Sequence, residues 1–294
     1  MSFEQIGILN VGEMGYHWAR LLRSHGATVL TYARDRSDVT RQRCENAQVE
    51  QLESLEALVG RADVIVSIVI PSAALDVARR VGEAALKVGR EGLVFVDANA
   101  ISPMTAGAIE AQLKPAGVGF VDGCIIGSAQ RLEKASVYVS GPGAERLQDL
   151  GAFGLSIRVL GEKVAQASAF KVVYAGLTKG LAGLLTELLM GAKRFDLLDE
   201  ILDRYEESFP GLTQKVGGGI TSLPLHAGRR SEEMAELAET FRHFGLNPIV
   251  TPSIEGILKS IAALELGQPS GKGERTGSLV ETIDLFAAKG LLSD

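Results

Sequence analysis

The segment Gly7-Ile8-Leu9-Asn10-Val11-Gly12-Glu13-Met14-Gly15 joins an apolar run, predicted to be a strand, to an amphipathic stretch, predicted to be a helix. Its spacing matches the dinucleotide-binding turn G-x-G-x-x-G, except that Asn10 holds the first glycine position. Asn tolerates a positive φ better than most residues, while Gly12 permits close approach of a pyrophosphate and Gly15 permits close packing of helix on strand. An ordinary glycine-containing turn would look similar, but the βαβ pattern that follows favours a dinucleotide site. The residues expected there are Asn10, Val11, Gly12, Glu13, Met14 and Gly15.

Downstream of this turn, short β-branched runs alternate with amphipathic stretches, which is typical of a parallel sheet covered by helices. Beyond Gly161, long segments rich in Ala, Leu, Glu and Lys replace these runs. We therefore predict an α/β Rossmann-type domain over residues 1–162 and an all-α domain over residues 163–294. The predicted strands are Ile6–Asn10, Thr28–Ala33, Val64–Ile70, Leu93–Asp97, Gly119–Asp122, Ser136–Ser140 and Ile157–Leu160.

The helical periodicity predicts one helix between the first two strands and further helices in the second half. The first spans Met14–Ser24, the longest runs from about Val164 to Arg194, and another spans Ala227–Phe244. The segment Ser208–Gly219 contains Pro210 and three consecutive glycines, so it is expected to interrupt the helices.

The residues after the second predicted strand, Tyr32-Ala33-Arg34-Asp35-Arg36-Ser37, favour NADP as the cofactor. NAD enzymes place an acid near the end of this strand to accept hydrogen bonds from the ribose, whereas NADP enzymes place Arg nearby for the 2′-phosphate. Here Ala33 stands at the acid position, and Arg34 and Arg36 follow it. NAD is the alternative, because Asp35 could reach a ribose and the two arginines could be solvated loop charges.

Composition limits the partners of the chain. The 294 residues are 46% hydrophobic and 22% charged, with a formal net charge of −6, which argues against nucleic acid and against a membrane surface. The amino terminus lacks the pattern of a secretory signal and no apolar run reaches transmembrane length, so we expect a cytoplasmic location. The two cysteines fit a reducing compartment, and no Cys/His cluster has the spacing of a metal site. These features predict a small-molecule substrate and no metal.

Several segments together resemble the β-hydroxyacid dehydrogenase and 6-phosphogluconate dehydrogenase superfamily over nearly the whole chain. They are the turn with Met14 before Gly15, the arginine after the second strand, Val69-Ile70-Pro71 closing the third, and Asp97-Ala98-Asn99 before Pro103. The resemblance implies an NAD(P)-dependent oxidoreductase, further cofactor contacts at Val69, Ile70 and Asn99, and a homodimer built on the helical domain. The carboxyl-terminal half departs from the familiar members, which indicates a divergent branch.

Two motifs of this superfamily are altered. The substrate loop, usually Asp-Ala-Pro-Val-Ser-Gly-Gly, is Asp122-Gly123-Cys124-Ile125-Ile126-Gly127-Ser128, so Ile126 aligns with the usual substrate-binding serine. The catalytic lysine of a Lys-x-x-x-Asn pattern falls on Lys171, but Ala175 replaces the asparagine. The resemblance therefore implies Lys171 as the catalytic residue and substrate contacts at Ile126, Gly127 and Ser128.

Lys171 also stands out on its own helix. The residues that share its face are otherwise small, which leaves room for a ligand; they are Ala167, Ser168, Ala175, Thr178 and Ala182. An amine there could take the proton that an alcohol loses with its hydride, and Tyr174, three residues on, could be a second proton donor. The alternative is a packing face, with Lys171 reaching to water and the Tyr174 hydroxyl in solvent.

On a later helix, His226, Glu233 and either Arg229 or Arg230 share one side, where they could contact an anionic substrate; solvated salt pairs are the alternative. Cys124 is expected to be a small packing residue. The predicted function is hydride transfer between NADP(H) and a small hydroxy or oxo acid, with Lys171 as general acid/base. Two rivals stay open, namely reduction of a C=N bond as in imine reductases, which resemble this architecture, and a non-catalytic NADP-binding sensor or interaction protein.

Overall fold

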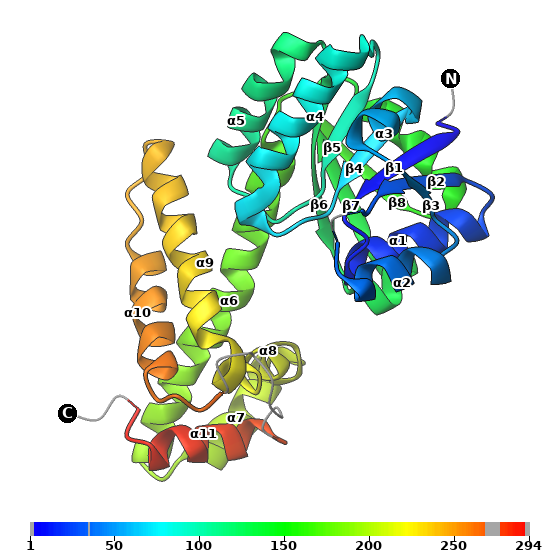
Figure 1. Cartoon of the computed structure of the whole chain (residues 1–294). Helices are drawn as coiled ribbons and strands as arrows, with labels where there is room; N and C mark the ends of the chain where they lie inside the picture. The colour runs from blue at the N-terminus through cyan, green and yellow to red at the C-terminus, as the bar shows by residue number, and fades with distance from the viewer. Residues whose placement is uncertain (1–2, 35, 268–276, 292–294) are drawn as a thin grey trace. The chain divides into compact units, whose positions relative to one another are not determined.

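The computed structural model describes residues 3–34, 36–267 and 277–291. The chain forms two compact units, Met1–Val172 and Val173–Asp294 (Figure 1). The first is a sheet with helices on both faces, and the second is helical. The predicted fold class, an α/β Rossmann-type part followed by an all-α part, is confirmed.

The first unit is organised around one eight-stranded sheet in the order β3-β2-β1-β4-β5-β6-β7-β8. Neighbouring strands are parallel except for the antiparallel pair β6–β7, so β7 and β8 run opposite to the rest. The strands are β1 Gln5–Leu9, β2 Thr28–Tyr32, β3 Glu50–Leu52, β4 Val64–Ser67, β5 Val94–Asp97, β6 Gly119–Ile126, β7 Ser136–Ser140 and β8 Ser156–Gly161.

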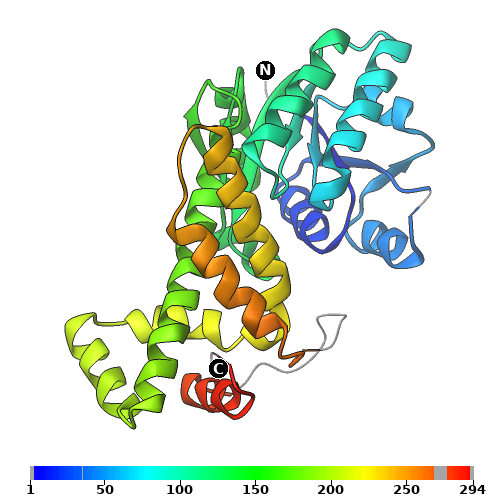
Figure 2. The same cartoon turned by 90° about the vertical axis from the view of Figure 1, so that its left-hand side faces the viewer.

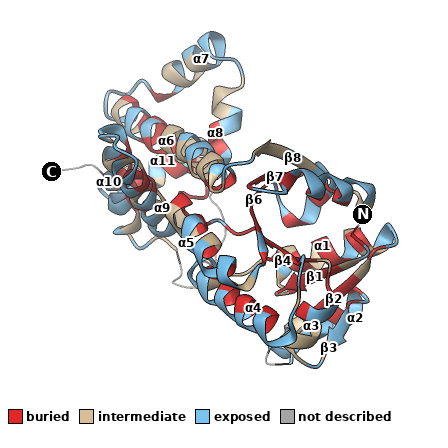
Figure 3. Ribbon diagram, turned by 90° about the horizontal axis from the view of Figure 1, so that it is seen from above, coloured by how far each residue is buried: buried red, intermediate tan, exposed pale blue. Residues whose placement is uncertain are grey.

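Helices bury both faces of this sheet, which explains why β4 and β5 are continuous apolar runs rather than alternating ones. One core contains Trp18 from α1 and Leu147 from η4, and the other contains Leu58 from α3 and Ile109 from α5. Figure 3 shows the central strands buried and the outward faces of the helices exposed. The helical segments are α1 Glu13–Ser24, α2 Asp38–Asn46, α3 Leu55–Arg61, η1 Pro71–Ala73, α4 Ala74–Val88, α5 Pro103–Leu113, η2 Lys114–Ala116, η3 Ala129–Lys134 and η4 Ala144–Phe153.

Three strands differ from the prediction by three residues or more, and one of them, β4, ends at Ser67 instead of Ile70. The edge strand β3 was not predicted, because its three residues, Glu50–Leu52, carry no apolar alternation. Strand β6 continues to Ile126 instead of ending at Asp122, because the antiparallel partner β7 pairs with its second half, Ile126 opposite Ser136. Pairing with the next strand of the chain thus sets the length of β6.

The second unit consists of helices, of which α9 and α10 lie side by side (Figure 2). Small residues on α6 let its neighbours come close. A Cβ on Gly176 would collide with Leu237 of α9, and one on Gly183 would lie 3.0 Å from Ile254 of α10. The helices are α6 Gln166–Arg194, whose first turns belong to the first unit, α7 Leu198–Ser208, α8 Leu212–Ile220, α9 Leu223–His243, α10 Val250–Ala262 and α11 Leu279–Ala288.

The expected interruption over Ser208–Gly219 is partly wrong. The chain does leave the helix after Ser208, but α8 begins at Leu212 and includes the three glycines. Gly217 is buried, and a Cβ on Gly219 would lie 3.5 Å from Ala182 of α6. Close packing against α6 therefore stabilises a helix that glycine propensity alone disfavours.

Helix α6 also corrects the statement that no apolar run reaches transmembrane length. Its length and composition alone would allow it to cross a membrane, with an 18-residue window of mean hydropathy 1.3 that is 33% buried. Lysine and glutamate residues divide α6 into short apolar segments. The sequence therefore shows no single uninterrupted apolar run, although the helix as a whole is apolar on average.

Candidate active site

The predicted dinucleotide turn connects β1 to α1. Asn10 has a φ of 71°, the left-handed conformation that glycine usually supplies at this position. A Cβ on Gly15 would collide with the Asn10 carbonyl oxygen, so only glycine lets the first turn of α1 lie against the end of β1. A Cβ on Gly12 would meet only the Asn10 amide, at 3.5 Å. Gly12 therefore leaves backbone open to a ligand.

The amino end of α1 has the features of an anion site. Ser37, Ser54 and Ser102 cap α2, α3 and α5, each accepting a hydrogen bond from a backbone N–H of the first turn. Among the described residues no side chain caps α1 in this way, so its first N–H groups are available to a ligand. Strand β1 lies between β2 and β4, where the strand order reverses, and doubly wound sheets bind nucleotides at that point. The turn thus fits a diphosphate.

A hollow of about 120 Å³ lies beside the carboxyl ends of β1 and β2. Its wall combines apolar groups with Tyr32, Arg36 and Arg80, and the apolar groups are Leu9, Leu55 and Val77. This mixture suits an adenosine with a charged ribose substituent. Sequence reasoning found Arg36 but missed Arg80, because only the packing of α4 on the sheet brings Arg80 there. Arg34 is exposed and is not part of this wall.

The side chain of Asn99 holds the loop after β4. Its Oδ1 accepts a hydrogen bond from the Val69 N–H at 2.6 Å, and its Nδ2 donates to Asp97 and Ser67. Asn99 is 5% exposed, whereas Ile70, the next residue of the loop, is 67% exposed. Asn99 therefore shapes the loop that presents Val69 and Ile70.

The predicted substrate loop, Asp122–Ser128, is strand over most of its length, because β6 continues to Ile126 and only Gly127 and Ser128 lie beyond it. Ile126 is half-buried, whereas Gly127 and Ser128 are exposed. Gly127 has a φ of 145°, and a Cβ there would lie 2.5 Å from the Ala135 side chain, so this position also requires glycine. Cys124 is fully buried, and burial raises the pKa of its thiol to about 12, which makes it an unreactive packing residue.

Lys171 lies against the same strand. It belongs to α6, is half-buried, and its Nζ donates a hydrogen bond to the Ile125 carbonyl oxygen at 2.5 Å. One turn earlier, Ser168 donates from its backbone N–H and its hydroxyl to the Asp122 carboxylate, at 2.8 and 2.6 Å. The first unit therefore brings the predicted lysine and the predicted substrate loop together.

Three further predicted residues lie in the second unit. Tyr174 is 47% exposed on α6, and His226 is half-buried on α9. Glu233 forms ion pairs with Lys179 of α6 and Arg229 of α9. These are the salt pairs that the alternative interpretation of this helix predicts.

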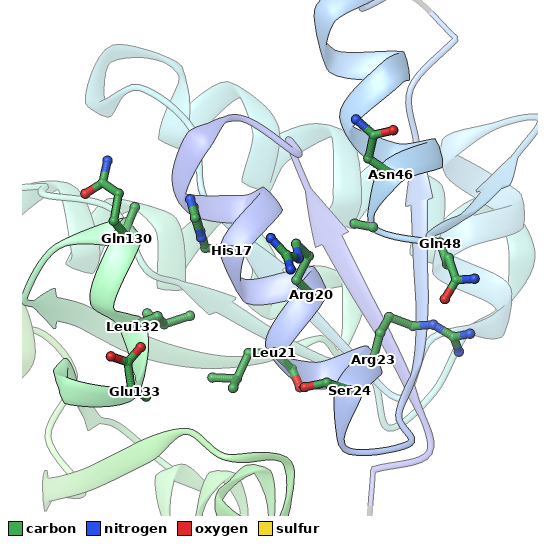
Figure 4. A pocket seen from close by; sticks show the side chains of 12 residues that line it. His17, Arg20, Leu21, Arg23, Ser24, Asn46, Gln48, Gln130, Leu132 and Glu133 are labelled. Atoms are coloured by element: carbon green, nitrogen blue, oxygen red, sulfur yellow. The ribbon is translucent and has the colours of Figure 1, made fainter.

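A second hollow, of about 400 Å³, lies along the carboxyl-terminal half of α1 (Figure 4). His17 and Arg20 of α1 point into it, with Gln48 on one side and Gln130 and Glu133 of η3 on the other. It contains none of the residues predicted for cofactor, substrate or catalysis. Within the described ranges, no group of three or more His, Cys, Asp or Glu residues could hold a metal ion.

Comparison with known families agrees with this geometry. Residues 5–152 match the family described as the NAD binding domain of 6-phosphogluconate dehydrogenase, and residues 192–261 match a domain of unknown function (DUF1932). The chain belongs to this family of 6-phosphogluconate dehydrogenase-like NAD-binding proteins. It is an NAD(P)-dependent oxidoreductase of the hydroxyacid dehydrogenase-like class.

Individual relatives cover nearly the whole chain. An uncharacterized 28.5 kDa protein of Methanothermus fervidus is 30% identical, over 87% of this chain and 98% of that protein. A conserved protein described as structurally similar to 3-hydroxyacid dehydrogenases is also 30% identical, with a TM-score of 0.78 over 90% of this chain and 100% of the other.

More distant structures share the fold alone. The 3-hydroxyisobutyrate dehydrogenase of Mycobacterium tuberculosis superposes with a TM-score of 0.75 at 16% identity, over 97% of this chain and 99% of the other. An imine reductase of Myxococcus stipitatus in complex with NADP+ has a TM-score of 0.58 at 16% identity, over 96% and 99% of the two chains.

Gly15→Ala is expected to weaken NADPH binding about tenfold, because the added methyl group must push α1 away from Asn10. Overpacking of this kind costs about 1–3 kcal/mol, and about 1.4 kcal/mol corresponds to a tenfold change. Titration followed by NADPH fluorescence measures the Kd. Gly60→Ala in α3 is the control, because its Cβ would meet nothing within 4 Å. Unchanged binding by Gly15→Ala would remove the turn from the cofactor site.

Proposed function

We propose that this protein transfers hydride between NADP(H) and a small, anionic hydroxy acid or the corresponding oxo acid, with Lys171 as general acid/base. The observation that carries the proposal is the place of Lys171. Its Nζ lies on the carbonyl of Ile125, directly before the substrate-loop residue Ile126, at the carboxyl end of β6. In open α/β sheets this end of the strands is where ligands bind.

The chemistry requires one group that moves a proton. Oxidation of an alcohol removes a hydride from carbon and a proton from oxygen, and a bound nicotinamide dinucleotide accepts the hydride. The neutral amine of Lys171 takes the hydroxyl proton, and in the reverse direction its ammonium returns that proton to the carbonyl oxygen. As ammonium, Lys171 also stabilises negative charge that develops on that oxygen. Tyr174, three residues along α6, is proposed as a second proton donor.

The preference for NADP is supported by the charge of the small hollow. Arg36 and Arg80 line it, and no acid is among the described residues of its wall. Guanidinium groups bind phosphate through paired hydrogen bonds, so these two arginines would hold the 2′-phosphate, with Arg34 at its exposed side. Asp35, the residue that could favour NAD, lies outside the described residues. The turn from Asn10 to Gly15 would hold the diphosphate.

The substrate contacts remain Ile126, Gly127, Ser128, His226 and Glu233. Ile126 offers no hydrogen bond where the superfamily has a serine, so an apolar part of the substrate fits there. Glu233 can contact the substrate only if its ion pairs with Lys179 and Arg229 break. The two cysteines are free and buried, which fits the reducing cytoplasm that we propose as the location.

Reduction of a C=N bond is the second candidate. It is favoured by the loss of two polar positions, at Ile126 and Ala175, and disfavoured by the retained Lys171. A non-catalytic NADP sensor would keep the turn and the small hollow without turnover. A panel of hydroxy acids, oxo acids and imines, tested with NADP(H) and NAD(H), separates the three functions.

We also propose a homodimer formed through α6. One side of this helix exposes large apolar residues at helical spacing, and they are Val173, Leu177, Leu184, Leu188 and Phe195. Monomeric proteins rarely expose a continuous apolar stripe of this kind. Because a twofold interface places the same patch on both subunits, a second α6 is the partner whose apolar side matches this one.

Leu184→Lys combined with Leu188→Lys is expected to convert the dimer to a monomer, because two charges would be buried at the interface. Light scattering coupled to gel filtration measures the mass. Leu86→Lys is the control, because Leu86 is similarly exposed but lies on α4. A wild-type monomer, or a dimer that survives both substitutions, would contradict the proposal.

Arg80→Ala is expected to raise the KM for NADPH about tenfold and to leave the KM for NADH nearly unchanged, because a hydrogen-bonded charge pair with the 2′-phosphate is lost. Arg79→Ala is a closely matched control. Arg79 is the neighbouring residue on α4, but it pairs with Asp76 and Glu83 on the helix surface. An equal effect of the two substitutions, or no loss of NADP preference in either Arg80→Ala or Arg34→Ala, would sink the NADP assignment.

Lys171→Ala is expected to lower kcat by about 10²–10⁴-fold without weakening NADPH binding, because general acid/base catalysis contributes that much. Steady-state rates on a substrate from the panel, together with the NADPH Kd, separate the two effects. Lys193→Ala, at the other end of α6, is the control and should retain full activity. An unchanged kcat in Lys171→Ala would contradict the proposal that Lys171 is the general acid/base.

A further inference from the structure

A row of buried polar side chains crosses four neighbouring strands of the first unit. Ser67 of β4 is in register with Asp97 of β5, Asp97 with Asp122 of β6, and Asp122 with Ser140 of β7. All four residues are 0% exposed. Neighbouring strands lie about 4.8 Å apart, so the row is continuous across this part of the sheet. The two carboxylates at its centre play no part in the chemistry proposed above.

One end of the row holds the loop after β4. The Asp97 carboxylate accepts hydrogen bonds from the Asn99 backbone N–H at 3.0 Å and from Asn99 Nδ2 at 2.8 Å. The same Nδ2 donates to Ser67 at 3.3 Å, and Asn99 Oδ1 accepts from the Val69 N–H. Asp97 thus orients the side chain that shapes the proposed cofactor loop.

The other end of the row holds the start of α6. Asp122 accepts the backbone N–H and the hydroxyl of Ser168, and also the hydroxyl of Ser140 at 3.3 Å. Ser140 in turn accepts the Ala167 N–H at 2.9 Å. Two of the first N–H groups of α6 are therefore satisfied by the row, and a carboxylate lies at the positive end of the helix dipole.

Strand β6 and helix α6 are joined a second time at Lys171. Asp122 and Ile125 are three residues apart on β6, and their partners Ser168 and Lys171 are three residues apart on α6. Three residues span about 10 Å on a strand but only about 4.5 Å along a helix. The extended side chain of Lys171 spans the difference between these two lengths and so reaches the Ile125 carbonyl. Where Lys171 Nζ lies along β6 is thus set by where Asp122 anchors the start of α6.

The ionised form of Asp122 is favoured by these contacts. Burial raises the pKa of both carboxyl groups, that of Asp97 to about 7, and the nearby Asp122 carboxylate adds to the rise at Asp97. Among the described residues, Asp122 has three donors from Ser168 and Ser140, whereas Asp97 has two, both from Asn99. These donors stabilise the charged form of Asp122 beneath α6.

We propose that Asp122 is a positioning residue that places the Lys171 ammonium by anchoring the amino end of α6 to β6. The catalytic meaning of this placement rests on the proposed function, but the placement itself does not. Asp122 acts through Ser168 and the helix, so its removal should free Lys171 from the Ile125 carbonyl without touching the dinucleotide turn.

Limited acetylation of the full-length protein with acetic anhydride, read by peptide mass spectrometry, tests the placement directly. Asp122→Asn is expected to speed acetylation of Lys171 by about threefold or more, as the loss of a hydrogen-bonded anchor would allow. Lys193, on the same helix but paired with Asp284, is the internal control and should react at its wild-type rate. Ser168→Ala removes only the hydroxyl contact and should give a smaller change in the same direction.

Asp63→Asn is the matched control variant. Asp63 accepts the backbone N–H groups of Glu4 and Gln5, so it also anchors backbone through a carboxylate, but at the start of β1, far from α6 in the sequence. It should leave the acetylation rate of Lys171 unchanged. An equal increase in Asp63→Asn would reveal general loosening and overturn the proposal, as would an unchanged rate in folded Asp122→Asn. If Asp122→Asn does not fold, Ser168→Ala decides alone.

Turnover provides an independent comparison. With an active substrate, Asp122→Asn should lower kcat while the Kd for NADPH stays within twofold, and it should cost nothing further when Lys171 is already Ala. A further loss in the Lys171→Ala background would overturn the positioning role. If acetylation of Lys171 responds to Asp122→Asn but Lys171→Ala retains normal turnover, the placement stands and the proposed function fails.

Discussion

The close approach of Gly15 to the carbonyl oxygen of Asn10 is the contact on which the nucleotide end of the first unit depends. Because no side chain fits between them, α1 starts directly at the end of β1. The left-handed backbone at Asn10 turns the chain sharply enough to make this possible. The uncapped amino end of α1 then lies where the strand order reverses, and the helix dipole and free N–H groups point to that place.

A second constraint follows from covering both faces of the sheet. Buried strands have no solvent for polar side chains, so each polar group on them needs a protein partner. Asp97 and Asp122 meet this requirement by holding Asn99 and Ser168, which belong to a loop and a helix. Asn99 and Ser168 are thereby fixed in place. The loop that Asn99 shapes and the helix turn that follows Ser168 contain the proposed cofactor contacts and Lys171.

The candidate site was predictable where one segment carries its own signal. The turn from Asn10 to Gly15 has the residue spacing of the dinucleotide-binding motif. Lys171 lies on a helix face of small residues and aligns with the catalytic lysine of the superfamily that the chain resembles. The hydrogen bonds of the Asn99 amide with Val69, Asp97 and Ser67 were not predicted. Such a role depends on hydrogen-bond partners on other strands, and no pattern within the segment encodes them.

Sequence alone determined the alternation of strands and helices in the first unit, the helical character of the second, and the position of the dinucleotide turn. These features depend on residues within a few positions of one another, which periodicity and turn chemistry describe. Only the tertiary structure decided that Arg80 joins Arg36, that Asp122 lies beneath Ser168, that β7 is antiparallel and that three glycines stay helical in α8. Each of these depends on contacts between separate segments, most of them far apart in the chain, where burial and close packing outweigh local preference.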